Sequence, residues 1–309
     1  MRVLTQLGGA LAERIAHAVP EATVVAVPGD GDPPPDAHGE VLLALPWGTA
    51  NLSAVLARGV RWVHILGTGI DRFPLHLLGD RLVTCSRGAS AVPIAEWVLA
   101  TMLAFEKRLP EVWIHEPPAG GWHVGALGGL AGKTLGLVGL GAIGQAVARR
   151  ALAFDMCVRA CRRTDTPSPL GGVEMMPSVA ALARVADHLV VAAPATAVTR
   201  HLVGPDVLVA VKAGVHLVNV ARGSLVDEQA LRTALDDGRV GMASLDAVEP
   251  EPLPPGHWMY THPRVRLSPH VSWNAPGALE ELVDRFIDNL RRHRDGRPLA
   301  GVVDREAGY

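Results

Sequence analysis

The stretch Leu135-Gly-Leu-Val-Gly-Leu-Gly-Ala-Ile-Gly-Gln-Ala-Val-Ala-Arg149 decides the fold of this chain. Its first six residues are mostly apolar, which is typical of a buried parallel strand, and the small and apolar residues after the glycines indicate a helix. Gly139, Gly141 and Gly144 give the spacing G-x-G-x-x-G between these two elements. A strand, a glycine turn and a helix in this order are the setting that a dinucleotide-binding unit requires.

The glycine turn has the chemistry to bind a pyrophosphate. Its first glycine allows the tight turn, the second lets phosphate approach the backbone, and the third lets the helix pack closely on the strand. The N-terminus of the helix adds unpaired amides and a partial positive charge. We therefore expect Gly139, Gly141, Ala142, Ile143 and Gly144 to bind a dinucleotide cofactor, and a purely structural turn is the alternative.

Length and composition describe a globular protein. A chain of 309 residues exceeds one typical core, so we expect two domains. Hydrophobic residues make up 49% and charged residues 19%, and a net charge of −2 gives no electrostatic reason to expect nucleic acid or an anionic membrane as partner. No signal pattern begins the chain and no apolar run reaches the ~18 residues of a membrane span, so a cytoplasmic location is expected.

The three cysteines of the chain give no sign of a disulfide framework or of a metal site. Cys157 and Cys161 are spaced C-x3-C but lack the companion ligands that a metal would need. Because both fall in an apparent strand, we expect them to be small buried residues, and we predict no bound metal.

Short apolar segments alternate with helical segments along the whole chain, which is typical of α/β domains with parallel sheets. Within 1–110 we expect helices at 51–58 and 92–105, a helix-compatible segment between the first two strands, and five strands: Met1–Leu7, Thr23–Val27, Val41–Leu45, Arg61–Leu66 and Leu82–Cys85. Residues 111–133, rich in Gly, Pro and Trp, mark the crossing into the second domain. After the glycine turn we expect a last helix at 277–294 and five further strands: Met156–Cys161, His188–Ala192, Val215–Val220, Met242–Leu245 and Val265–Leu267.

The end of the second strand of the dinucleotide unit indicates which cofactor binds. An NAD site usually has an acidic residue there, on the ribose 2′-hydroxyl. This strand instead ends in Arg162, Arg163 and Thr164, whose two guanidiniums and hydroxyl can hold a 2′-phosphate. Asp165 lies one residue further, past the strand end. We therefore predict NADP(H) in preference to NAD(H); solvated surface arginines are the alternative.

Three later segments place polar residues at strand ends, where an open α/β sheet binds its ligands. They bring Arg222, the carboxylates of Glu249 and Glu251, and His270. A fixed guanidinium, a histidine and a carboxylate suffice to reduce a 2-oxo acid. The arginine binds the substrate carboxylate, the protonated histidine gives a proton to the carbonyl oxygen as hydride reaches carbon, and the acid orients the histidine.

The chain resembles the D-isomer-specific 2-hydroxyacid dehydrogenases over nearly its full length. Eight ordered stretches carry the resemblance: Gly67-Thr-Gly-Ile-Asp71, Ala95-Glu96, Leu130-Ala-Gly-Lys-Thr-Leu-Gly-Leu-Val-Gly-Leu-Gly-Ala-Ile-Gly144, Ala193-Pro-Ala-Thr-Ala-Val-Thr199, Asn219-Val-Ala-Arg-Gly-Ser-Leu-Val-Asp227, Leu245-Asp246, Glu251-Pro-Leu-Pro254 and Ser268-Pro-His270. A fingerprint that begins only at Gly139 disfavours the L-specific lactate and malate dehydrogenases, in which it lies near the N-terminus.

The resemblance implies two Rossmann-like, doubly wound domains with the active site in the cleft between them. A discontinuous substrate domain, 1–97 with 275–309, would accompany a dinucleotide-binding domain at 98–274. The resemblance also implies homodimers. It assigns catalysis to Arg222, Glu251 and His270, and substrate binding to the backbone of Thr68 and Gly69. Besides Arg222, it places these residues around the cofactor: Pro194, Thr199, Val220, Ala221 and Asp246.

Within the family, the chain looks most like the NADPH-linked glyoxylate/hydroxypyruvate reductases. Trp47, the strand end at 162–164, His262-Pro-Arg-Val265 and the terminal Val303-Asp-Arg-Glu-Ala-Gly-Tyr309 suggest this. Trp273 departs from the family, which more often has a smaller residue there. Trp47 and Trp273 are candidates for the substrate pocket, although each could instead be a core residue. In the pocket they would either limit the substrate to the size of glyoxylate or favour an apolar substituent.

Two other functions remain compatible with the pattern. A non-catalytic NAD(P)-binding sensor on the same fold would bind cofactor without turnover, but the intact set of Arg222, Glu251 and His270 counts against it. An oxidoreductase acting on formate or phosphite would need further polar or basic residues for those anions, and no lysine lies near Gly67–Asp71.

Overall fold

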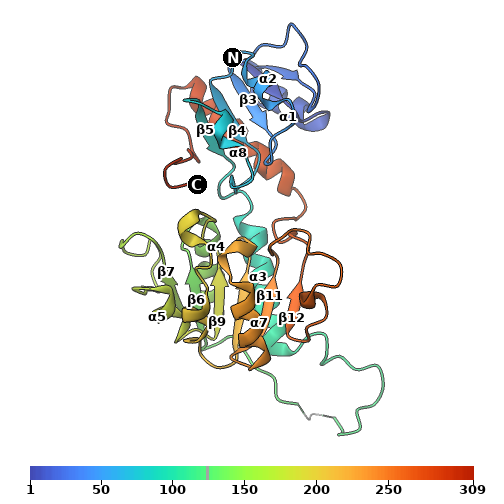
Figure 1. Ribbon diagram of the computed structural model, residues 1–309, viewed down its shortest axis with the longest axis vertical. Helices are drawn as coiled ribbons and strands as arrows, with labels where there is room; N and C mark the ends of the chain where they lie inside the picture. Colours follow the sequence, from blue (N-terminus) through green and yellow to red (C-terminus); the bar gives the residue numbers. More distant parts are fainter. Residues whose placement is uncertain (123–124) are drawn as a thin grey trace. The chain divides into compact units, whose positions relative to one another are not determined.

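The computed structural model describes residues 1–122 and 125–309, and this part of the chain divides into two compact units. One unit contains Met1–Ser90 and Ala275–Tyr309, and the other contains Ala91–Asn274 (Figure 1). The first break precedes the expected boundary at 98, because helix α3 runs without interruption over Ala91–Lys107 and packs entirely with the second unit. Residues 123 and 124 of the expected crossing segment lie outside the described residues.

The unit that holds both chain ends is built on a five-stranded parallel sheet of order β2-β1-β3-β4-β5. Its strands are β1 Arg2–Thr5, β2 Thr23–Ala26, β3 Val41–Ala44, β4 Trp62–Ile65 and β5 Leu82–Cys85. The helices are α1 Ala10–Ala18, α2 Leu52–Leu56, the short 3-10 helix η1 Leu75–Leu77 and the long α8 Ala278–Arg294.

The C-terminal segment belongs to this unit because it completes the sheet and its core. Every residue of β3 and β4 is buried, as expected for central parallel strands covered on both faces. From α8, the ring of Phe286 packs 5.8 Å from Trp62 and 5.1 Å from His64. The chain after α8 then runs beside β5, where the amide of Val303 donates to the carbonyl of Val83.

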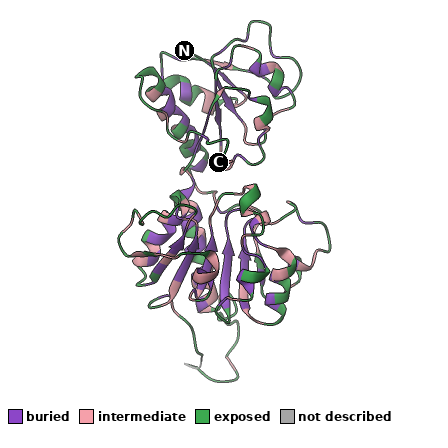
Figure 2. Ribbon diagram, turned by 60° about the vertical axis from the view of Figure 1, so that its left-hand side comes forward, coloured by how far each residue is buried: buried purple, intermediate pink, exposed green. Residues whose placement is uncertain are grey.

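The second unit contains a seven-stranded parallel sheet of order β12-β11-β10-β9-β6-β7-β8. Its strands are β6 Thr134–Val138, β7 Cys157–Cys161, β8 Val173–Met175, β9 His188–Val191, β10 Val215–Asn219, β11 Val240–Leu245 and β12 Val265–Leu267. Its helices are α3, α4 Ala142–Leu152, α5 Val179–Ala183, α6 Pro205–Leu208 and α7 Glu228–Asp236, with 3-10 turns η2 Ala197–Thr199, η3 Gly223–Leu225 and η4 Trp258–Tyr260. Figure 2 shows the buried residues concentrated in the strands of both sheets.

Side chains of the second sheet alternate between two apolar clusters, one on each face. Leu135 and Leu137 of β6 pack with α3 and α4, whereas Leu189 of β9 and Leu217 of β10 pack with α5, α6 and α7. One expectation is wrong for one residue: Cys161 is buried, but Cys157 is exposed. The two lie on the same face of β7, and Cys157 differs by its place at the start of the strand.

No helix of residues 1–122 and 125–309 is long and apolar enough to cross a membrane. The same residues contain no group of three or more histidine, cysteine, aspartate or glutamate side chains arranged to hold a metal ion.

Candidate active site

The candidate catalytic residues of the second unit follow three adjacent parallel strands. Arg222 follows β10, Glu251 follows β11 and His270 follows β12, and these strands lie side by side in the sheet. Because parallel strands end at the same edge, the three loops meet there.

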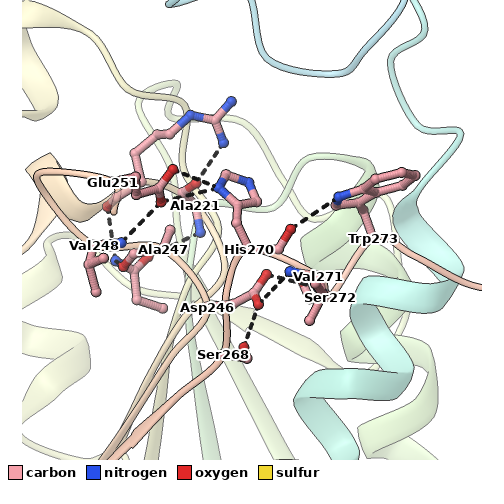
Figure 3. A network of polar contacts seen from close by, with 12 residues as sticks. Ala221, Asp246, Ala247, Val248, Glu251, Ser268, His270, Val271, Ser272 and Trp273 are labelled. Carbon is pink, nitrogen blue, oxygen red and sulfur yellow. Dashed lines mark hydrogen bonds and ion pairs between the residues drawn. The ribbon is translucent and has the colours of Figure 1, made fainter. Parts of the chain in front are cut away.

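His270 and Glu251 form the central contact of this edge (Figure 3). Nδ1 of His270 lies 3.1 Å from Oε1 and 3.0 Å from Oε2 of Glu251, and the histidine side chain is 34% exposed while the glutamate is 14% exposed. The amide of Val248 donates to Oε1 of Glu251 at 3.2 Å, which holds the carboxylate towards the ring. An ionised carboxylate accepts only, so Nδ1 of His270 carries the hydrogen and Nε2 points away from the pair.

The structure distinguishes the two glutamates of the β11 loop. Glu249 faces outward and forms an ion pair with Arg200, with 3.1 Å between Nη1 and Oε2. Only Glu251 lies against His270, so the acid of the pair is the residue immediately before Pro252.

Asn219, the last residue of β10, positions the loop that carries Arg222. Its Nδ2 donates to the carbonyl of Arg222 at 2.9 Å, and its Oδ1 accepts the amide of Ala221 at 3.0 Å. Gly223 then passes so close to the backbone of Val248 that a Cβ would lie 2.0 Å from its carbonyl carbon. The glycine is therefore what allows the arginine loop and the glutamate loop to meet. Sequence reasoning did not assign Asn219 a role, although a buried asparagine at a strand end was the available signal.

Asp246 lies at the end of β11 and is 2% exposed. Its carboxylate accepts the hydroxyl of Ser268 and the amides of Val271 and Ser272, each amide at 2.9 Å. Asp246 was expected beside the cofactor; the contacts that the structure records instead bind the loop of His270. Contact with the cofactor stays a prediction.

The two tryptophans have different environments. Trp47 follows β3 in the first unit and is 65% exposed, so the alternative that it is a core residue is wrong. Trp273 of the second unit is half-buried, packs against the core cluster of α3 and α4, and donates from Nε1 to the carbonyl of His270. Neither observation tests whether these side chains line a substrate pocket.

Thr68 and Gly69 lie in a loop after β4 that neighbouring residues hold in place. The carbonyl of Gly67 accepts the amide of Ser86 at 2.9 Å. Both Thr68 and Gly69 are half-buried, and the Oγ1 atom of Thr68 is buried without a hydrogen-bond partner among the described residues. The hydrogen bond from Ser86 thus fixes the start of the loop, and the hydroxyl of Thr68 has no recorded partner among the described residues.

The glycine turn fits a dinucleotide. Gly139 has φ 102°, and a Cβ there would lie 2.9 Å from the backbone of Ala192, while a Cβ on Gly144 would lie 2.2 Å from the carbonyl of Gly139. A Cβ on Gly141 would meet nothing within 4 Å. The first and third glycines are therefore required by packing, and the second faces the open space at the N-terminus of α4 that a pyrophosphate would fill.

The end of β7 supplies cationic groups and no acid at 162–164. Nη2 of Arg162 donates to the carbonyls of Thr166 and Pro167, both at 2.7 Å, and also contacts Oγ1 of Thr166. The Nε of Arg162 is buried without a partner among the described residues, and Arg163 and Thr164 are exposed. Arg162 therefore orders the loop, and its unpaired Nε fits an additional anionic acceptor.

The remaining predicted cofactor residues follow β9 and β10. Oγ1 of Thr199 donates to the carbonyl of Pro194 at 2.7 Å, and Thr196 caps the same 3-10 turn. Val220 and Ala221 are buried between β10 and the arginine loop. The sequence analysis did not predict that Thr196 caps this turn. The spacing of Thr196 and Thr199, three residues apart as in a capping box, was the available signal.

Comparison with known proteins agrees with this geometry. The family model of the D-isomer specific 2-hydroxyacid dehydrogenase, NAD binding domain, matches residues 99–272. A glyoxylate/hydroxypyruvate reductase A of Arabidopsis thaliana is 34% identical over 246 residues, 78% of this chain and 77% of that protein. The chain therefore belongs to the D-isomer-specific 2-hydroxyacid dehydrogenase family.

Solved structures give the same result for the full chain. A D-isomer specific 2-hydroxyacid dehydrogenase from Xanthobacter autotrophicus, in complex with NADPH and MES, is 27% identical with a TM-score of 0.84 over 100% of this chain and 99% of that one. An NADPH-dependent glyoxylate/hydroxypyruvate reductase from Sinorhizobium meliloti, in complex with NADP and malonate, is 28% identical with a TM-score of 0.77 over 98% and 96%. The predicted family, α/β fold class and enzyme class are confirmed: the protein is an oxidoreductase of the 2-hydroxyacid dehydrogenase type with a nicotinamide cofactor.

Proposed function

We propose that this enzyme reduces a small 2-oxo acid, such as glyoxylate or hydroxypyruvate, to the D-2-hydroxy acid at the expense of NADPH. The contact of His270 with Glu251 at the sheet edge that also carries Arg222 is the observation on which the proposal rests. The similarity to glyoxylate/hydroxypyruvate reductases supports the substrate class.

The chemistry follows from the orientation of the three side chains. When bound, the reduced nicotinamide supplies the hydride. Glu251 accepts the hydrogen of Nδ1 of His270, which leaves Nε2 to donate a proton to the carbonyl oxygen of the substrate. The carboxylate also stabilises the positive charge on the imidazole before the transfer. The guanidinium of Arg222 binds the substrate carboxylate and polarises its carbonyl.

The two units divide the binding task in this proposal. The unit of Ala91–Asn274 binds the dinucleotide through its glycine turn, and the other unit binds the substrate carboxylate through the amides of Thr68 and Gly69. A half-buried loop braced by Ser86, with an unused Thr68 hydroxyl, supports this role. The exposed Trp47 favours a second candidate, a 2-oxo acid with a bulkier apolar substituent, because an exposed indole offers apolar contact area.

The preference for NADPH is supported by the charge at the end of β7. Arg163 and Thr164 are exposed there, and the nearest acid, Asp165, follows them on the exposed loop. An acid on the ribose would repel a 2′-phosphate, whereas a guanidinium attracts it.

We also propose a homodimer, supported by the segment between α3 and β6. This segment exposes large apolar side chains, with Trp113 at 67% and Trp122 at 72% exposure, which water disfavours unless a partner covers them. Light scattering should give a particle mass of twice 32.6 kDa, and a mass of 32.6 kDa would contradict the proposal. The expected cytoplasmic location stays a prediction.

One assay tests the proposed function: oxidation of NADPH and of NADH, in parallel, with glyoxylate, hydroxypyruvate and bulkier 2-oxo acids. Turnover of the small acids with a higher kcat/KM for NADPH supports the proposal in full. Turnover of bulky acids alone would keep the mechanism and replace the substrate, and equal kcat/KM with both cofactors would refute the NADPH preference. Cofactor binding without turnover of any acid would indicate a sensor.

A further inference from the structure

The peptide group that joins His270 to Val271 is held at both of its polar atoms (Figure 3). Its carbonyl oxygen accepts the indole Nε1–H of Trp273 at 3.1 Å. Its amide, that of Val271, donates to Oδ1 of Asp246 at 2.9 Å. This peptide plane is therefore fixed from two sides by side chains that do not touch the imidazole in any recorded contact.

The backbone of His270 needs such support. Its φ is 55°, in the left-handed region, where the Cβ of an L residue is crowded by the backbone. A residue in this conformation relaxes to a commoner one unless the surrounding contacts prevent it. Because φ and ψ set the direction of the Cα–Cβ bond, any relaxation would also turn the imidazole away from Glu251.

Both side chains that hold the peptide are themselves anchored in the second unit. Asp246 is 2% exposed at the end of β11, and its other oxygen accepts the amide of Ser272 at 2.9 Å. The ring of Trp273 packs against the apolar cluster of α3 and α4. In Figure 3 the indole lies beside α3, while Asp246 lies on the opposite side of the loop. The loop is thus tied both to the sheet and to a helix.

We propose that Trp273 and Asp246 are positioning residues that hold the His270–Val271 peptide and thereby aim the imidazole at Glu251 and the substrate. The proposal rests on the proposed function, because the proton transfer from His270 belongs to it. In this proposal Trp273 acts through its hydrogen bond to the carbonyl of His270 and not through contact with the substrate. Its effect is on the rate of proton transfer and not on the binding of either reactant.

The test compares two tryptophan-to-phenylalanine variants of the full-length enzyme. Trp273→Phe keeps an aromatic ring on the apolar cluster but removes the donor to His270. Trp258→Phe is the matched control, because Trp258 lies in the same unit and donates its Nε1–H to Glu228 at 2.7 Å, away from the His270 loop. A less firmly held imidazole stabilises the transition state less, and a deficit of about one hydrogen bond predicts a kcat about tenfold lower for the first variant. KM for the 2-oxo acid and Kd for NADPH should change less than about twofold, and the control should retain the wild-type kcat.

A second measurement separates positioning from general damage. Combined with Glu251→Gln, Trp273→Phe should lower kcat by much less than it does alone, because both changes disturb the same pair. Fully additive effects would overturn the proposal. Hydrogen exchange in peptides covering 268–273 should be faster in Trp273→Phe than in the control, whatever the activity.

The outcomes distinguish the positioning role from the function on which it rests. If the wild-type enzyme reduces no 2-oxo acid, the proposed function is wrong. Faster hydrogen exchange at 268–273 in Trp273→Phe would still support the role of Trp273 in holding the His270–Val271 peptide. Unchanged exchange together with unchanged kcat would overturn the positioning role and leave the function standing. If Trp273→Phe does not fold, Asp246→Asn tests the other contact, and unchanged exchange of the Val271 and Ser272 amides would overturn it equally.

Discussion

The buried His64 should make the first unit less stable in mild acid, because the unfolded chain binds a proton there and the folded chain does not. His64 is a fully buried residue of β4, opposite Thr84 of β5, and its burial lowers its pKa to about 3. A row of hydrogen bonds passes through His64. On one side Nε1 of Trp62 donates to the hydroxyl of Thr84 at 2.9 Å, and that hydroxyl lies 2.7 Å from Nδ1 of His64. On the other side Nε2 of His64 lies 3.0 Å from the hydroxyl of Ser86, which donates to the carbonyl of Leu282 at 2.8 Å. The hydroxyl of Ser86 gives its hydrogen to the carbonyl of Leu282, so it accepts a hydrogen from Nε2 of His64. The neutral ring carries one hydrogen, so Nδ1 of His64 is unprotonated and accepts from Thr84.

The sign and the size of the effect follow from proton linkage. The unfolded chain binds a proton to His64 below its ordinary pKa of about 6.5, while the folded chain remains neutral there until about pH 3. Between these values the unfolded state holds more protons, so the free energy of unfolding falls as the pH falls, and the dependence ends below about pH 3. From pH 7.5 to pH 4.5 the loss is about 3 kcal/mol, a large fraction of a typical stability.

Urea unfolding at several pH values, followed by circular dichroism, measures this loss. His64→Gln retains one donor and one acceptor but cannot titrate, so its free energy of unfolding should depend less on pH between 6.5 and 4.5. His76→Gln, at an exposed position of the same unit, is the control and should keep the wild-type slope. The same slope in all three proteins would refute the reasoning, because the pKa of His64 would then not differ between the two states.

Two further predictions concern the candidate active site. His270→Ala should reduce kcat by a factor of about 100 or more while leaving Kd for NADPH nearly unchanged, since the proposed role of the histidine is to give a proton and not to hold the cofactor; calorimetric loss of NADPH binding would contradict that role. Arg163→Ala should raise Kd for NADPH far more than Kd for NADH, whereas Arg159→Ala, which breaks the ion pair between Arg159 of β7 and Glu174 of β8, should change neither. An equal effect of Arg163→Ala on both cofactors would mean that this guanidinium does not meet the 2′-phosphate.

The parts that sequence predicted well are those fixed by local pattern. The apolar run before Gly139 and the glycine spacing predicted β6, the turn and α4, because each glycine answers a backbone requirement that acts within a few residues. The strand before Arg222 was equally visible, since every residue of β10 is buried and most of them are apolar. Predicted and observed elements therefore agree where the structure is determined by residues close together in the sequence and by a regular apolar pattern.

The parts that sequence missed depend on contacts between distant residues. β8 covers only Val173–Met175 at the sheet edge, where a half-exposed strand leaves no apolar run to detect. The exposure of Cys157 depends on where β7 begins in the fold, because Cys157 is its first residue while Cys161, on the same face, is buried at its other end. The helix itself was predicted to within a residue of its start at Ala91, but the sequence did not show that the whole of α3 packs with the second unit, so the expected boundary at 98 fell inside it.

The carboxylates after β11 show most clearly what pattern alone could not decide. Asp246, Glu249 and Glu251 lie within six residues and are chemically alike, yet their contacts differ completely. Asp246 accepts the donors of the His270 loop, Glu249 pairs with the exposed Arg200, and Glu251 accepts the amide of Val248 and faces the imidazole. The one that works with the histidine is thus selected by the donors that two folded loops bring to it, rather than by its own side chain. The amide of Val248 lies three residues before Glu251, but His270 lies 19 residues after it. The sequence therefore shows that acids are present, and the fold shows which of them faces the histidine.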